Sequence, residues 1–162
     1  MAAAAQRKDP LRNFKFKVEF EAARGAAKAS FGFSKVSGLK ESSEIIEYRE
    51  GGQKEGTAMK MPGQTSYDNI VLERGKPANV SGDAYFRTWR NLIAKAGEAG
   101  VADPTQRRTM TIQLLDRNNT PIRTYKCVNC WPSEIEIADL EGDGNDVLIE
   151  SVTICHEGFT EL

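Results

Sequence analysis

The chain has 162 residues, of which 40% are apolar and 28% are charged, and 22 Lys and Arg residues nearly balance 23 Asp and Glu residues, for a net charge of −1. This balance gives no electrostatic reason to expect nucleic acid or an anionic membrane as a partner. No apolar run approaches the roughly 20 residues that cross a bilayer, and the first ten residues lack the apolar core of a signal peptide. Three cysteines, an odd number, indicate reduced thiols in a cytosolic product rather than a disulfide framework.

The first part of the chain predicts an arm followed by a strand. The length fits one domain over residues 1–162, in which residues 1–13 are small and polar and form an N-terminal arm without a core of its own. Residues 14–21 then alternate between apolar and charged side chains, which predicts a strand with one face in the core. That apolar face consists of Phe14, Phe16, Val18 and Phe20.

Residues 40–60 predict a protruding hairpin or loop. Glu44–Tyr48 and Thr57–Met61 have strand character, but the segment between them is charged and rich in glycine, so the pair has little apolar cover. Protruding strands present unpaired backbone groups that invite pairing with another chain. Directly after this segment, Met61-Pro62-Gly63 predicts a turn.

The remaining elements predict one helix and several further strands. The helix begins near Ser81, a suitable N-cap, carries Asp83 in its first turn and stops near Gly97. Its apolar face is formed by Tyr85, Phe86, Trp89, Leu92, Ile93 and Ala96. Alternating segments over 109–114, 122–130, 134–137 and 146–156 predict strands, with a Trp-Pro corner before the third. We therefore expect a mainly β (α+β) fold, a barrel or sandwich of two antiparallel sheets with one covering helix.

Several short motifs follow one another along nearly the whole chain. They are Asp9–Phe14, Val36–Leu39, Tyr48–Gly52, Met61–Gly63, Ile70–Gly75, Asn129–Ser133, Asp146–Glu150 and His156–Phe159. Taken in this order, they resemble the inner-tube proteins of contractile phage tails and of phage-tail-like contractile injection systems.

This resemblance implies a structural subunit of tail-tube fold, with itself as the main partner. Hexameric rings would stack into a hollow tube inside a contractile sheath, with a baseplate and spike at one end and a cap at the other. Sheath contraction would drive the tube through a target envelope, and the lumen would convey cargo protein or DNA. We expect assembly in the cytoplasm into a virion or tail-like particle, without membrane insertion by the monomer.

Subunit contacts are expected where strands or turns protrude: in the arm, in the 40–60 hairpin and in the acidic turn over 139–146. The interface residues that we predict are Glu44, Glu47, Tyr48, Arg49, Glu50, Lys54, Glu55, Asp139, Glu141 and Asp143.

Two groups of residues are candidate metal sites that would not fit a purely structural subunit. Cys127 and Cys130, with Cys155 and His156, have the ligand types of a zinc site. However, residues i and i+3 of a regular strand point to opposite faces, which favours thiols in a β core. Residues 139–150 approach a calcium loop, but their flanks alternate like strands, which favours an acidic hairpin turn.

No cofactor and no enzymatic activity are expected. The chain has no nucleophile, metalloprotease or phosphate-loop motif, and its only histidine, His156, has no partnered Ser or carboxylate motif. The alternative function is a monomeric β-sandwich binding module in which Ca²⁺ or Zn²⁺ holds the C-terminal hairpin.

Overall fold

The computed structural model describes residues 15–21, 28–52, 56–76, 80–98, 106–142 and 146–162, with helix side chains described from residue 84 to residue 95. The predicted arm over 1–13 lies outside these ranges, and so do the side chains expected to cap the helix. Over the described ranges, no helix combines the length and the apolar character that crossing a membrane requires.

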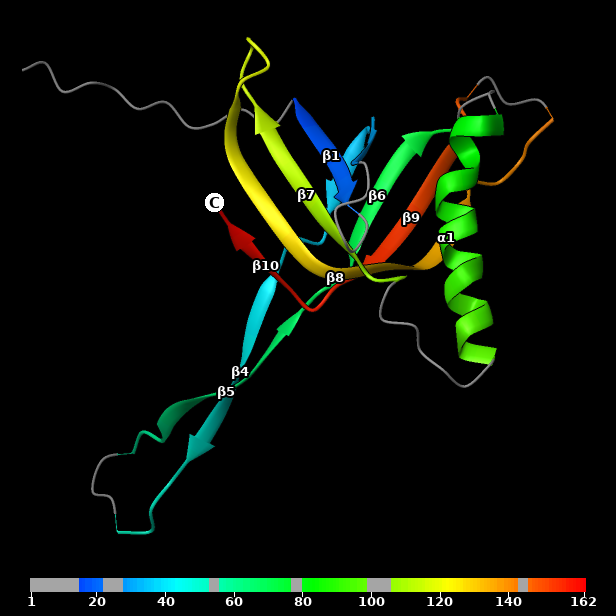
Figure 1. Cartoon of the computed structure of the whole chain (residues 1–162). Helices are drawn as coiled ribbons and strands as arrows, with labels where there is room; N and C mark the ends of the chain where they lie inside the picture. The colour runs from blue at the N-terminus through cyan, green and yellow to red at the C-terminus, as the bar shows by residue number, and fades with distance from the viewer. Residues whose placement is uncertain (1–14, 22–27, 53–55, 77–79, 99–105, 143–145) are drawn as a thin grey trace, which may run out of the picture.

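Antiparallel strands dominate the fold, and one helix stands beside them (Figure 1). The elements in chain order are β1 (Phe16–Glu21), β2 (Ala29–Phe31), β3 (Lys35–Ser37), β4 (Glu41–Tyr48), β5 (Met59–Tyr67), β6 (Ile70–Gly75), α1 (Val80–Glu98), β7 (Arg108–Leu115), β8 (Pro121–Ile137), β9 (Ile149–Cys155) and β10 (Gly158–Glu161). The main sheet has the order β2-β1-β7-β8-β9-β6-β3, with β10 also on β8, while β4 and β5 pair only with each other.

The 17-residue strand β8 connects the two layers of the body. Its first part pairs with β7 and β10, and its second part pairs with β9. Between these parts Asn129 has a φ of 53°, in the left-handed region that asparagine tolerates. The chain bends there, so that the strands on either side of the bend form two antiparallel layers joined by β8. The predicted two-sheet fold with one covering helix is therefore confirmed (Figure 1).

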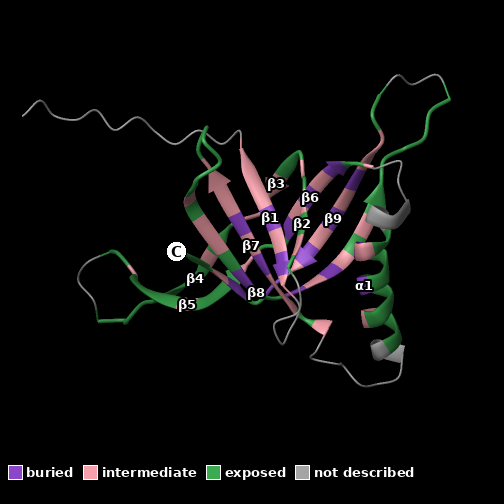
Figure 2. Ribbon diagram, turned by 45° about the horizontal axis from the view of Figure 1, so that its top comes forward, coloured by how far each residue is buried: buried purple, intermediate pink, exposed green. Residues whose placement is uncertain are grey.

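The core lies between the sheets and under the helix, and Figure 2 shows buried residues alternating along β1, β6, β7 and β9. The predicted alternation is confirmed at Val18 and Phe20, which are fully buried. On α1, Phe86 and Trp89 are fully buried, and both rings pack against Phe20 at centroid distances of 5.3 and 5.6 Å. Edge-to-face contacts of this kind stabilise a core beyond its buried area.

The end of this core holds a buried ion pair that the sequence patterns did not predict. Arg74 lies directly opposite Glu150 across β6 and β9. Its Nε and Nη2 atoms both donate to Oε2 of Glu150, at 3.0 and 2.8 Å, and its guanidinium lies over the rings of Phe31 and Phe86. Both members of the pair are less than 10% exposed, so the charges compensate each other in a largely dry environment.

The predicted turn at Met61-Pro62-Gly63 is wrong, because these residues lie inside β5. Pro62 is opposite Ile45, next to a register irregularity between Ser43 and Ile45. A proline can occupy a strand at an edge or beside a bulge, where its missing N–H costs no ladder hydrogen bond. The predicted strands over 122–130 and 134–137 are likewise one bent strand, because the Trp-Pro corner continues the pairing.

Candidate assembly interface

The β4–β5 hairpin projects away from the two-sheet body (Figure 1). Near the body its strands are joined by hydroxyl pairs, with Ser42 and Ser66 at 3.1 Å and Ser43 and Thr65 at 3.1 Å. Farther out the hairpin carries large apolar side chains that remain about half exposed or more: Ile45, Ile46, Tyr48, Met59 and Met61. An isolated two-stranded ribbon is marginal in water, so packing of another surface on these side chains would stabilise the hairpin.

The hairpin has one apolar face and one mixed face. Ile46 lies opposite Met61, and Tyr48 lies opposite Met59. Because directly opposite residues share a face and alternate positions along a strand share it too, these four side chains form one surface, the apolar hairpin face. Their exposed fractions run from 46% to 51%. The other face carries Ile45 and Pro62 and the cross-strand pair Glu47–Lys60, whose charged atoms are 3.8 Å apart.

The base of the hairpin is fixed to the body by a small aromatic cluster. His156 is buried, and its Nε2 atom lies 2.9 Å from the carbonyl oxygen of Asp68, just after β5. Tyr67 packs against His156 and Phe159, with ring centroids 5.8 Å apart in each pair. The single histidine therefore has a packing and hydrogen-bonding role where the hairpin joins the body.

The predicted interface residues fall into two separate groups. Glu44, Glu47, Tyr48, Arg49 and Glu50 lie on or beside the outer half of β4 and are exposed. Asp139 and Glu141 are exposed in the β8–β9 loop, which lies at the opposite end of the body in both views (Figures 1 and 2).

The remaining three predicted residues, Lys54, Glu55 and Asp143, fall outside the described ranges. The prediction favoured charged residues, and of the apolar hairpin face it included Tyr48 but omitted Ile46, Met59 and Met61. The sequence does contain a signal for the apolar hairpin face. Ile46 and Tyr48, like Met59 and Met61, occupy alternate positions in two segments predicted to pair.

The predicted orientation of Cys127 and Cys130 toward opposite faces of a strand is wrong. Cys127 and Cys130 are both fully buried on one side of β8. Cys130 lies opposite Arg108 and Cys127 lies opposite Met110, so three steps along β8 match two along β7. This bulge, centred near Asn129, resets the alternation that a regular strand would keep. A hydrogen bond with Cys127, and then burial, raise the pKa of the Cys130 thiol, as expected for a core cysteine.

The residues of the two candidate metal sites have other partners or lie apart. In the described part of the chain, no group of three or more His, Cys, Asp or Glu side chains is arranged to hold a metal ion. Glu150, the last residue of the possible calcium loop, points inward and binds Arg74.

The sequence matches the family of the T4-like virus tail tube protein gp19 over residues 12–160. The chain belongs to this tail tube family. The predicted family is therefore confirmed. Among curated proteins, none is significantly similar to this chain.

Solved structures of injection systems share the fold of this tail tube protein. A chain of the anti-feeding prophage baseplate superposes with a TM-score of 0.79 at 22% identity, over 96% of this chain and 97% of that one. A chain of the PVC sheath-tube complex in the extended state gives a TM-score of 0.73 at 24% identity, over 94% of this chain and 91% of that one. A chain of the PVC sheath/tube terminator in the extended state gives a TM-score of 0.77 at 24% identity, over 96% of this chain and 98% of that one.

Proposed function

We propose that this tail tube protein functions by polymerising, with six copies in a ring and rings stacked into a hollow tube. The observation that carries the proposal is the apolar hairpin face, whose four side chains are still about half exposed in the described part of the chain. A second copy that packs on this face would remove it from water, and apolar burial is the main favourable term in association. The sixfold symmetry stated for the anti-feeding prophage baseplate supports rings of six.

The body offers further surfaces for contact between copies. Strands β2 and β3 end the order of the main sheet, so over the described residues each has one edge without a neighbouring strand. Such edges pair readily with strands from other chains. Heterologous contacts close into rings when the rotation closes, and a net charge of −1 lets identical subunits pack with little repulsion. We assign the ten predicted residues to these contacts, in one domain with an N-terminal arm over 1–13.

Around the tube we place a contractile sheath, a baseplate with a spike at one end and a cap at the other. The likeness to chains from sheath-tube, terminator and baseplate structures supports these partners and favours an injection-type particle over an infectious phage. The tube assembles in the cytoplasm, conveys protein cargo or DNA when the sheath contracts, and has no enzymatic role.

The test compares substitutions on the two faces of the hairpin. Ile46→Thr with Met61→Thr removes two of the four side chains of the apolar hairpin face while keeping residues that suit strands. All these side chains are exposed, so unfolding free energy should change by no more than about 0.5 kcal/mol. Negative-stain microscopy and sedimentation should show rings or tubes for the wild type, including in EDTA, and small particles for the variant.

The matched control is Lys60→Gln, which alters the opposite face of the hairpin and should still assemble, because the exposed ion pair of Lys60 contributes little. Normal tubes from the threonine variant would contradict the role of the apolar face. A wild type that stays monomeric at high concentration would overturn the polymerisation proposal itself.

A further inference from the structure

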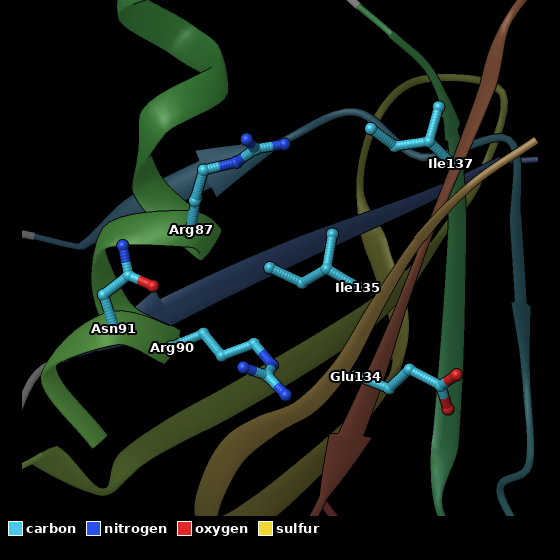
Figure 3. Close-up of a pocket in the computed structure, with 6 residues that line it drawn as sticks. All are labelled: Arg87, Arg90, Asn91, Glu134, Ile135 and Ile137. Atoms are coloured by element: carbon cyan, nitrogen blue, oxygen red, sulfur yellow. The ribbon is translucent and has the colours of Figure 1, made fainter. Parts of the chain in front are cut away.

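A hollow lies between α1 and the second part of β8 (Figure 3). Its volume is about 430 Å³, and we name it the α1–β8 groove, lined by Arg87, Arg90, Asn91, Glu134, Ile135 and Ile137. Arg87 and Arg90 extend from the helix toward Ile135, which forms an apolar floor between them. Ile137, at the end of β8, adds a second apolar side chain that is 39% exposed. The groove therefore combines an apolar floor with a charged rim.

The rim is mainly basic. From Ala84 to Lys95, α1 carries three cationic side chains and no carboxylate, although the whole chain is nearly neutral. Arg87 has no ion pair with any described residue, and Arg90 donates from Nε to the carbonyl oxygen of Ser133 at 3.3 Å, which leaves its charge uncompensated. Glu134 is the one carboxylate among the lining residues. A ligand for this groove should bring negative charge and an apolar side chain.

The β8–β9 loop of the same protein has this composition. Asp139, Glu141 and Asp146 are exposed, and none of them forms an ion pair within the described ranges. Among these acidic residues, Leu140 is 80% exposed and Val147 is 72% exposed. The sequence Asp139-Leu140-Glu141 thus presents one apolar side chain between two carboxylates, which complements one apolar floor between two guanidinium groups.

The described residues of the loop do not line the groove of their own copy. Ala138 N donates to the carbonyl oxygen of Ile149 at 2.9 Å, and Lys76 N donates to that of Leu148 at 2.8 Å. These hydrogen bonds fix both ends of the loop to the sheet, and Leu140 remains in solvent with Ile137 still exposed. The loop of one copy is therefore available to contact the groove of another copy.

We propose that the α1–β8 groove of one copy receives the β8–β9 loop of a second copy, with Leu140 on Ile135 and Ile137 and with Asp139 and Glu141 beside Arg87 and Arg90. This inference rests on the proposed self-assembly and names a second contact, distinct from the hairpin. The contact joins different surfaces on the two copies, so it repeats from copy to copy. Complementary charges at such a contact set its register and exclude wrong partners.

Charge reversal provides the test. Arg87→Glu with Arg90→Glu, or Asp139→Arg with Glu141→Arg, should each lower the assembled fraction about tenfold or more, because like charges would then face each other. All four substitutions in one chain restore opposite charges and the wild-type net charge, so this swapped variant should assemble. The altered side chains are exposed, so the denaturant midpoints of all three variants should match the wild type and exclude misfolding.

A cross-link gives an independent measurement. A Leu140→Cys protein mixed with an Asn91→Cys protein should form a disulfide-linked pair that neither protein forms alone, and the wild type measures the background from Cys155. Assembly that survives either reversal, or a swapped variant no better than the single reversals, would overturn this contact. Variants with normal tubes that fail only to bind sheath would likewise overturn it and assign the groove to the sheath. If the wild type forms tubes while any of these results is obtained, only the groove contact is overturned and the proposed role of the hairpin in polymerisation is unaffected.

Discussion

The body and the hairpin are built from the same kind of structure and differ in what covers them. In the body, antiparallel strands direct alternate side chains into a core whose members, including Val18, Phe20 and Trp89, are fully buried. In the hairpin, strands of similar length carry apolar side chains of similar size, but these remain 46% to 65% exposed. Strand pairing alone therefore does not bury them.

This difference separates residues that stabilise the subunit from residues available to join subunits. Burying a large apolar side chain contributes roughly 1.5–3 kcal/mol, and the body gains this within one chain. The hairpin can gain it only when a second surface approaches. We therefore expect substitutions in the body to change unfolding, and substitutions on the hairpin to change assembly.

The largest expected effect is that of Trp89→Ala, which should lower the free energy of unfolding by about 4–5 kcal/mol. The side chain is fully buried, its Nε1 donates to the carbonyl oxygen of Gln106 at 2.7 Å, and its ring lies under the guanidinium of Arg108 at 4.5 Å. Its loss removes packing, a hydrogen bond and a cation–π contact together. Urea unfolding followed by circular dichroism measures the change.

Leu92→Ala is the matched control on the same helix. Leu92 was predicted to lie on the apolar face of α1, yet it is 41% exposed. Its truncation should cost far less than that of Trp89, because little buried area is lost. Equal effects of the two substitutions would contradict the described orientation of the helix.

The next effect concerns the ion pair at the end of the core. Arg74→Met should destabilise by about 3 kcal/mol, because Glu150 would remain buried without its main partner. The cost lies at the lower end of the range for buried pairs, since Nζ of Lys76 is 3.9 Å from Glu150. Adding Glu150→Leu should recover part of the loss, because no unpaired charge then remains. A double variant less stable than Arg74→Met, measured by the same unfolding experiment, would contradict this explanation, because Glu150 would then stabilise the fold without Arg74.

The sequence was informative where a simple period governs the structure. The alternation over 14–21 predicted β1 and its buried face, and the 3.6-residue period predicted α1. The motif order predicted the family. Local exceptions were not predicted: Pro62 was interpreted as a turn because prolines usually interrupt strands, and the bulge near Asn129 reversed the expected direction of Cys130.

The two faces of the hairpin and the α1–β8 groove were not predicted, for a related reason. The protruding hairpin follows from a glycine-rich, charged segment between two short strands, which sequence alone reveals. Which side chains share a face depends on the register, and Ile46 lies opposite Met61 only because the irregularity near Ser43 shifts the pairing. The α1–β8 groove depends on how a helix packs on a distant strand, and no local pattern contains that information.

The smallest of these effects lies at the junction between body and hairpin, at Gly38. Its φ of +92° is in the region that favours glycine, and an added Cβ would lie 2.1 Å from the carbonyl oxygen of Asn69. Gly38→Ala should therefore destabilise by about 1–3 kcal/mol, the usual cost of a strained backbone position. Relief of the clash requires movement between the segments that enter and leave the hairpin, so assembly should fall further than stability alone explains. Gly32→Ala is the control, since nothing lies within 4 Å of its added Cβ. Urea midpoints and tube yields that match for the two variants would show that the junction does not fix the direction of the hairpin.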